Sequence, residues 1–276
     1  MTDTPITPPM EMGSTRSFFH DLAMSFRRPH YWTYSTWMRL GLKYRRTALG
    51  PLWIVVGPAF FVIFLGYLFS RVNSSPTDVF VPHMATGYIT WTLISGFIIG
   101  GSTVFVSRRT EILQGNMRLT DLALAACFDT LLLFLHQAVV ILAVFLFFMK
   151  APAPTAPFAL LGLLVLFANG LWVTTFLGII GARQRDLVEV IAAVTRIMFF
   201  ITPIIWIPQN GTGGFLGAYL VFNPFYHFLE MVRAPLLGTP VATVSYMVVG
   251  TITVVGFAVT WLTYRRLVRG VPLWVL

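Results

Sequence analysis

The sequence predicts an all-α integral membrane protein: six transmembrane helices, an N-terminal interfacial amphipathic helix, and a re-entrant hairpin before the last span. Three observations lead to this fold class. Hydrophobic residues make up 57% of the 276 residues and charged residues only 11%, against about 25% charged in a typical soluble domain. Six long stretches carry no charge at all, and most Lys and Arg residues gather in alternate gaps between them.

Each charge-free stretch is long enough to cross a bilayer, because a helix rises about 1.5 Å per residue and about 20 apolar residues cross the hydrocarbon core. The stretches hold 20 to 33 residues and occupy 47–70, 79–107, 130–149, 151–182, 197–229 and 234–264. Within them we expect spans at about Leu52–Ser70, His83–Ser107, Leu122–Met149, a fourth ending near Ala182, then Leu187–Ile207 and Thr243–Tyr264.

The basic residues predict the orientation of the chain. If the N-terminus is cytoplasmic, 15 of the 19 Lys and Arg lie on that side and 3 on the far side. This positive-inside bias places both termini in the cytoplasm. We therefore expect a cytoplasmic tail at 1–28, a six-span domain at 50–264 and a second cytoplasmic tail at 265–276. The high pI reflects this topology and attraction to anionic headgroups, and no nucleic-acid partner is expected.

Residues 29–49, before the first span, have the pattern of a helix that lies in the membrane interface. One helical face carries Tyr34, Trp37, Met38, Gly41, Tyr44 and Ala48, and the opposite face carries Arg39, Lys43 and Arg46. An apolar, aromatic face opposed by a basic face is typical of interfacial helices.

The fifth charge-free stretch is too long for one crossing and too short for two. Pro203, Pro208 and a glycine-rich break at 211–214 interrupt it. We expect a re-entrant or interfacial hairpin that continues to about Leu237. Irregular backbone at membrane depth is tolerated where it is buried in protein or lines a path, so this region predicts the outer mouth of a conduit. Aromatic residues that could stack on sugar rings there are Phe222, Phe225, Tyr226 and Phe228. Packing of the hairpin onto the spans is the alternative interpretation.

Ionisable residues inside the predicted spans are functional candidates, because their burial in a membrane is costly. They are Asp129, His136, Arg196, Glu230 and Arg233. We expect Asp129 and Arg196 to take part in structural ion pairing between spans. Glu230 and Arg233 are three residues apart, a spacing that favours a local salt bridge. Cys127 is expected to be a packing residue, and Gly96–Gly100 a close-packing face.

The sequence lacks the residues that nucleotide hydrolysis requires. A P-loop needs a lysine after a glycine, but Lys43 follows leucine and Lys150 follows methionine. Neither metal-ligand spacing nor a Gly-x-Ser-x-Gly elbow is present in the sequence. We therefore expect no cofactor on this chain and no enzymatic activity of its own.

Three segments resemble type-2 ABC exporter permeases, and most closely the branch that exports lipid-linked O-antigen and related polysaccharides. They are Tyr44-Arg-Arg-Thr-Ala-Leu-Gly-Pro-Leu-Trp53, then Arg185-Asp186 with Phe200-Ile-Thr-Pro-Ile-Ile-Trp206, and Asn223-Pro-Phe-Tyr-His-Phe-Leu-Glu-Met-Val-Arg233 with its following Pro-Leu-Leu-Gly238. They occur in the order found in that branch and are spread over most of the chain.

The resemblance implies a permease subunit in the inner membrane that pairs with a second copy of itself. It also implies two copies of a separate ABC ATPase subunit, which would bind ATP and Mg. The loop from Arg108 to Asp121 would be the coupling element, with Arg108, Arg109 and Glu111 as contacts to the ATPase. The alternative interpretation is that these are ordinary charges of a cytoplasmic loop. The cargo implied is a lipid-linked polysaccharide. A small-molecule, drug or lipid exporter of the same superfamily is the alternative, and a membrane-embedded enzyme or assembly factor is an alternative of another class.

Overall fold

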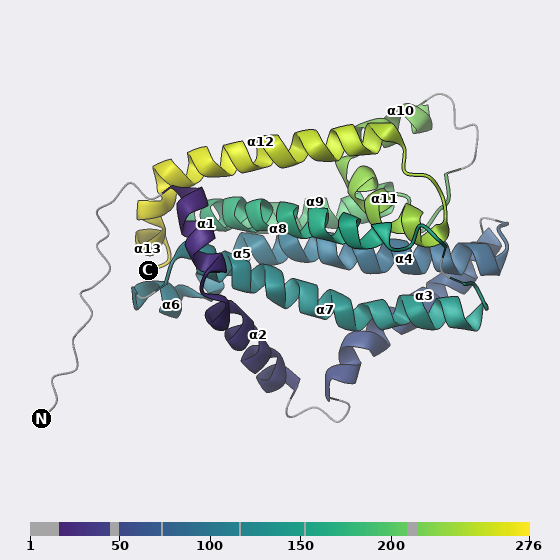
Figure 1. The fold of residues 1–276 in the computed structure, drawn as a ribbon, viewed down its shortest axis with the longest axis horizontal. Helices are drawn as coiled ribbons and strands as arrows, with labels where there is room; N and C mark the ends of the chain where they lie inside the picture. The colour runs from purple at the N-terminus through teal and green to yellow at the C-terminus, as the bar shows by residue number, and fades with distance from the viewer. Residues whose placement is uncertain (1–16, 45–49, 73, 116, 152, 209–214) are drawn as a thin grey trace, which may run out of the picture.

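The computed structural model describes residues 17–44, 50–72, 74–115, 117–151, 153–208 and 215–276, and over these ranges the chain is helical and has no strand. Its long helices form one bundle, and most of them lie along a common axis (Figure 1). They are α3 (Trp53–Val72, preceded by the 3-10 turn Gly50–Leu52), α4 (Thr77–Ser95) continued by α5 (Gly101–Ser107), α7 (Leu119–Phe147), α8 (Phe158–Arg183) and α12 (Thr243–Leu267). The central helix is α8, which packs against α5, α7, α11 and α12.

Five helical segments are long and apolar enough to cross a membrane in the described part of the chain. They are Gly50–Val72, Thr77–Ser107, Leu119–Phe147, Phe158–Arg183 and Thr243–Trp274. All five fall on predicted spans, although the second begins six residues before the expected His83. These helices make the chain a multi-pass membrane protein.

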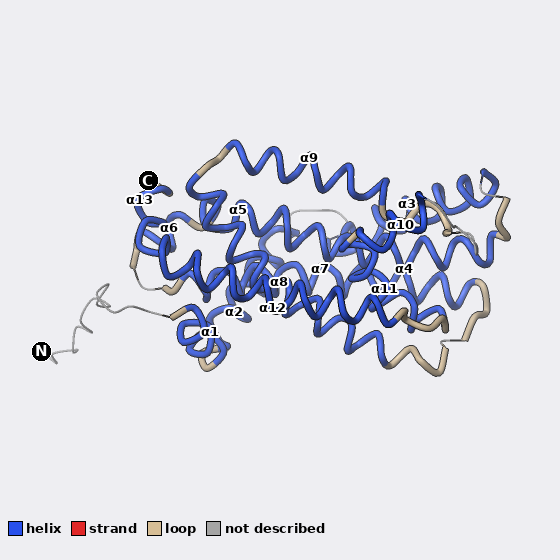
Figure 2. The backbone as a smooth tube through the Cα atoms, turned by 90° about the horizontal axis from the view of Figure 1, so that it is seen from above, coloured by secondary structure: helices blue, strands red, loops and turns tan. Residues whose placement is uncertain are grey.

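The fifth predicted span falls on α9 (Asp186–Ile201), which has 16 residues and is therefore about 24 Å long. It runs along one side of the bundle (Figure 2). The predicted end at Ile207 is wrong, because the helix stops at Ile201. Thr202 has extended backbone, with φ −75° and ψ 138°. It precedes Pro203, whose ring disfavours the α conformation of the residue before it.

A π-helical turn at Gly96–Gly100 joins α4 to α5 and changes the predicted glycine face. A Cβ atom on Gly96 would collide with Thr130 of α7, whereas Gly100 has open space around it. In a π-turn each hydrogen bond spans five residues, instead of four as in an α-helix. The turn therefore holds one extra residue, and Gly101 rather than Gly100 faces the neighbouring helix. A Cβ atom there would lie 2.7 Å from the Cα atom of Thr174, so α5 and α8 require a glycine at this position.

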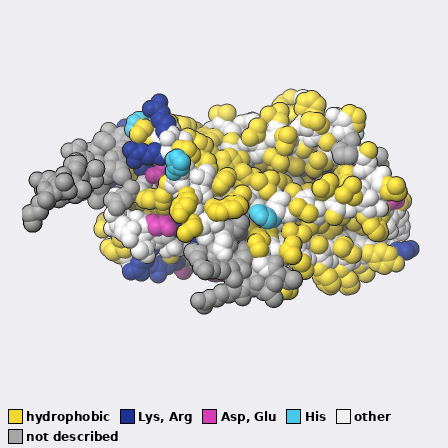
Figure 3. Space-filling view, turned by 60° about the horizontal axis from the view of Figure 1, so that its bottom comes forward, with side chains coloured by type: hydrophobic (Ala, Val, Ile, Leu, Met, Phe, Trp, Pro, Cys, Tyr) yellow, Lys and Arg dark blue, Asp and Glu magenta, His cyan; other side chains and the backbone are white. Residues whose placement is uncertain are grey.

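One end of the bundle, called the basic end below, carries α1 (Phe18–Phe26), α2 (Pro29–Tyr44), α6 (Arg109–Leu113) and α13 (Val271–Trp274), the last reached through the 3-10 turn Val268–Gly270. Figure 3 shows Lys and Arg side chains gathered at this end and apolar side chains over the middle of the molecule. Exposed arginines near it include Arg27, Arg28, Arg109, Arg183, Arg185, Arg265 and Arg266.

Both segments predicted as tails contain short helices that pack on the bundle. In α1, Phe18, Asp21 and Ser25 are buried. The Tyr264 hydroxyl of α12 donates to Asp21 Oδ2 at 2.9 Å. In α13, Val271 is buried. The guanidinium of Arg183 lies over the ring of Trp274, with its Cζ atom 5.7 Å from the ring centroid. Residues 18–26 and 271–274 are thus part of the folded domain.

The opposite end, called the hairpin end, carries α10 (Phe215–Phe222) and α11 (Pro224–Leu237). Asn223 separates them and caps α11, since its Oδ1 accepts hydrogen bonds from the backbone of Phe225 at 3.0 Å and Tyr226 at 3.4 Å. Gly238 ends α11 in the left-handed conformation with φ 76°, the usual residue for such an ending. The predicted glycine-rich break at 211–214 lies outside the described residues.

Candidate coupling site and outer hairpin

A charged cluster at the basic end joins α2, α6 and α7. Arg108, between α5 and α6, is only 6% exposed, and its Nη2 donates to Asp129 Oδ2 of α7 at 2.9 Å. Its Nη1 lies 3.8 Å from Glu111 Oε2. Arg39 of α2 lies 3.7 Å from both carboxylates, and the Tyr31 hydroxyl donates to Glu111 Oε2 at 3.1 Å. The cluster therefore ties the short helix α6 to the helix before the first span.

The electrostatics of this cluster follow from its burial. Burial lowers the pKa of Arg108, and the positive charge of Arg39 lowers it further. Burial also raises the pKa of Tyr31 to about 12, with Glu111 adding to the rise. Two carboxylates balance two guanidinium groups here, and this balance is needed because an unpaired buried charge is costly.

The residues predicted to contact an ATPase occupy two different environments. Arg108 and Glu111 take part in the internal cluster, and Arg109 is exposed on α6. Leu113, four residues further on and 44% exposed, lies on the same face because residues at i and i+4 are neighbours on a helix. Arg109 and Leu113, together with the exposed Thr110, are therefore the side chains that α6 presents outward.

The residues predicted for the interfacial helix also separate. Trp37 is 67% exposed, as is expected for a helix face that meets lipid. Arg39, predicted on the opposite basic face, points inward to Glu111 and Asp129. On the inner side of α2, the Thr36 hydroxyl donates to the Ala125 carbonyl of α7 at 3.2 Å. The side chains of Lys43 and Tyr44, and the whole of Arg46, lie outside the described residues.

At the hairpin end, a second polar cluster compensates the irregular backbone after α9. Arg233 of α11 is 3% exposed and forms the predicted local ion pair with Glu230. Its Nη1 donates to the Pro203 carbonyl and lies 3.1 Å from His83 Nε2 of α4. The Trp206 carbonyl lies 3.2 Å from the same His83 nitrogen. The carbonyl groups of Pro203 and Trp206 lie beyond the end of α9 and have no helical hydrogen bonds. They therefore have side-chain partners, as buried irregular backbone requires.

The four aromatic residues predicted for a substrate path do not share one surface. Phe225 and Phe228 line a cavity inside the bundle. Phe222 is 83% exposed at the end of α10, and the Tyr226 ring packs edge-on against His227. The structure therefore brings together two of the four.

The remaining predicted groups have local roles. Asp129 forms its ion pairs with Arg108 and Arg39. Arg196, which was also expected to pair between spans, makes no ion pair with any described residue. The Arg196 Nε–H donates to the Ala192 carbonyl of its own helix at 3.2 Å. His136 likewise contacts the Leu132 carbonyl at 2.7 Å. Cys127 is fully buried and packs near Thr174, as predicted.

Sequence reasoning missed Tyr31 and His83. Both act through partners more than 75 positions away in the chain, and no spacing rule within one helix identifies such pairs. For His83 the available signal was an ionisable residue at the start of a predicted span, which sequence reasoning applied to His136 but not to His83.

A bundle of long apolar helices with a basic end defines a multi-pass membrane protein. The model of a family described as ABC-2 type transporter matches residues 32–237, about three quarters of the chain. The chain belongs to this family. It is accordingly a membrane subunit of a transporter, and the family implies an ABC ATPase partner. Comparison with curated proteins gave no match.

Proposed function

We propose that this chain is the permease of an ATP-driven exporter that moves a lipid-linked, O-antigen-like polysaccharide across the inner membrane. It acts as a homodimer with two copies of an ATPase subunit, which bind ATP and Mg. Family membership supports the permease role. The resemblance of segments 44–53, 185–206 and 223–238 to the polysaccharide-exporting branch supports the cargo.

The observation that carries the proposal is the attachment of α6. A coupling element must be displaced by the partner subunit and must transmit that displacement to the transmembrane helices as a rigid body. In α6, Arg109 and Leu113 face outward, while Glu111 and the preceding residue, Arg108, form ion pairs that connect the helix to α2 and α7. A displacement of α6 is therefore transmitted to two helices at once, and in this way ATP-driven closure of the partner shifts the dimer between two states.

A sixth crossing by α9 completes the proposed topology, with both termini cytoplasmic. The helix begins three residues after Arg183, whose side chain lies over Trp274 at the basic end, and ends beside the hairpin end, where the Pro203 carbonyl meets Arg233. The next long helix, α12, starts at the hairpin end and returns to the basic end (Figure 1). The chain must cross once between α8 and α12, and α9 supplies that crossing. The re-entrant hairpin is then α10 with α11, and α2 is the interfacial helix.

Depletion of the protein in its native cell, followed by extraction and sizing of lipid-linked glycans, tests the cargo. The expected result is long polymer accumulated inside and lost from the surface. Normal surface glycan together with raised sensitivity to amphiphilic drugs would refute polysaccharide export and favour the small-molecule exporter. Recovery of the chain from mild detergent without any ATPase subunit would instead favour an enzyme or assembly factor.

A further inference from the structure

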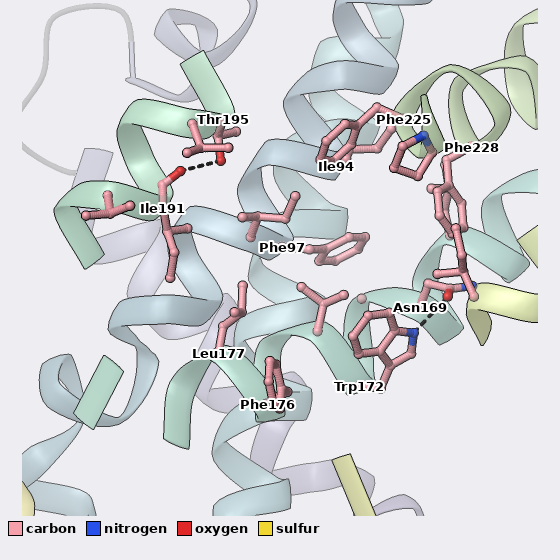
Figure 4. A pocket seen from close by; sticks show the side chains of 18 residues that line it. Ile94, Phe97, Asn169, Trp172, Phe176, Leu177, Ile191, Thr195, Phe225 and Phe228 are labelled. Carbon is pink, nitrogen blue, oxygen red and sulfur yellow. Dashed lines mark hydrogen bonds between the residues drawn. The ribbon is translucent and has the colours of Figure 1, made fainter. Parts of the chain in front are cut away.

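A cavity of about 470 Å³ lies within the bundle between α8, α9, α11 and the π-helical turn (Figure 4). Its volume falls in the range of about 300–1,000 Å³ that is usual for small-molecule sites. On the α8 side it extends from Leu166 to Leu177, and on the α9 side from Val190 to Thr195. The rings of Phe97, Phe225 and Phe228 also line it.

The few polar groups in the wall of this cavity are already hydrogen-bonded to the protein. Asn169 Nδ2 donates to the Val165 carbonyl and to Thr253 Oγ1, each at 2.9 Å. The Trp172 indole donates to Asn169 Oδ1 at 2.8 Å, and the Thr195 hydroxyl donates to the Ile191 carbonyl at 2.7 Å. A polar ligand or a water molecule would find no free donor among these groups, and apolar cavities of this kind stay dry and take apolar molecules.

The shape of the cavity follows the long axis of the bundle. From Leu166 to Leu177 the wall formed by α8 rises about 17 Å, roughly half the hydrocarbon thickness of a bilayer. Among the spanning helices, this places an elongated apolar space near the middle of the membrane. An extended hydrocarbon chain fits that length better than a compact molecule does.

The cavity is open on the side of α9. Val190 and Val194 belong to its wall and are nevertheless 54% and 47% exposed, and α9 stands along one flank of the bundle (Figure 2). At this depth the surroundings of the bundle are lipid chains rather than water. The bilayer can therefore supply the occupant directly, without a water-filled entrance.

We propose that this cavity binds one hydrocarbon chain of a lipid, inserted between α8 and α9. The chain is either an acyl chain of a phospholipid or the polyprenyl chain of a lipid carrier, which present the same chemistry to the wall. An acyl chain as occupant is independent of the proposed cargo, because a membrane subunit that exports another substrate would meet the same bilayer, whereas a polyprenyl chain would be the lipid part of that cargo and rests on the proposed function. Its consequence is that a bound lipid sets the separation of α9 from α8.

Native mass spectrometry of the full-length protein tests the proposal after detergent has stripped loosely bound lipid. The variant Val194→Trp fills the cavity from α9. The matched control is Ile197→Trp, because Ile197 is 55% exposed on the same helix and is not part of the cavity wall. We expect one lipid per chain in the wild type and in Ile197→Trp, and its loss in Val194→Trp.

Loss of the fold is separated from loss of the lipid by the unfolding temperature of each variant. Should Val194→Trp unfold, Leu177→Trp fills the same space from α8 and replaces it. Re-adding a phospholipid or a polyprenyl phosphate to stripped wild-type protein identifies the source, since the mass of the retained species names it. A wild type that retains no lipid, a filled variant that retains as much as the wild type, or retention of a compact apolar molecule in place of a lipid would each overturn the proposal.

Discussion

The ion pair between Arg108 and Asp129 offers a direct test of the charged cluster at the basic end. The change Asp129→Asn removes the carboxylate that lies 2.9 Å from a guanidinium that is 6% exposed. Removing one partner of a fully buried pair costs about 3–5 kcal/mol. Asp129 is 32% exposed, and Glu111 stays 3.8 Å from Arg108, so part of the loss is compensated. We expect the free energy of unfolding to fall by about 2–3 kcal/mol.

Intrinsic tryptophan fluorescence during heating in detergent measures this loss. For a domain of about this size, 1 kcal/mol corresponds to about 2–4 °C, so the midpoint should fall by about 4–12 °C. The control is Asp78→Asn, which removes the partner of Lys150 at 3.4 Å in a pair whose members are 36% and 55% exposed. Such surface pairs are worth about 0–1 kcal/mol. Equal midpoints for the two variants would refute the view that burial of Arg108 makes the cluster stabilising.

Three further predictions concern α6, α2 and α11. Arg109→Ala should leave the unfolding temperature unchanged and reduce co-purification of the ATPase subunit, because its side chain is exposed; an undiminished yield of complex would contradict this. The pKa of Tyr31 is raised from 10.0 to about 12, so the unfolded chain ionises first, and stability that is complete below pH 10 is lost as the pH rises toward 12. Tyr31→Phe should flatten unfolding temperatures measured across that range, and an unchanged slope would exclude the effect. Asn223→Ala removes the N-cap of α11 and should lower stability by about 1 kcal/mol, measured by the same thermal unfolding; a midpoint equal to that of the wild type would show that the cap is dispensable.

The spans were predictable because a membrane helix is encoded by composition alone. A run without charge that exceeds about 20 residues has few other structures open to it, and five such runs became long helices. The helix α1 was missed because its composition does not identify it as a helix. It has nine residues and includes an aspartate and a histidine, and only packing against α7 and α12 makes such a segment helical.

The site was less predictable than the spans. Glu230 and Arg233 were paired correctly because a spacing of three residues settles their geometry within one helix. The partners of Arg108 and Asp129 depend on how three helices pack, and charge position alone does not contain that information. The same holds for Arg39, whose placement opposite an aromatic face suggested the headgroups, although the neighbouring carboxylates of α6 and α7 face it.

The contact between Asp21 and Tyr264 has a consequence for how the protein is made. These residues lie 243 positions apart, so α1 leaves the ribosome long before the helix that receives it exists. Until α12 is made the Asp21 carboxylate lacks this hydrogen bond and has only Arg118, 3.9 Å from Oδ1, as a largely buried partner among the described residues, so its full burial is unfavourable before that point. Docking of α1 is therefore complete only after α12 has been made, although its other neighbour, α7, is made earlier. A chain that stops before Tyr264 lacks both the hydroxyl that binds the buried Asp21 and the ring that packs against Phe18.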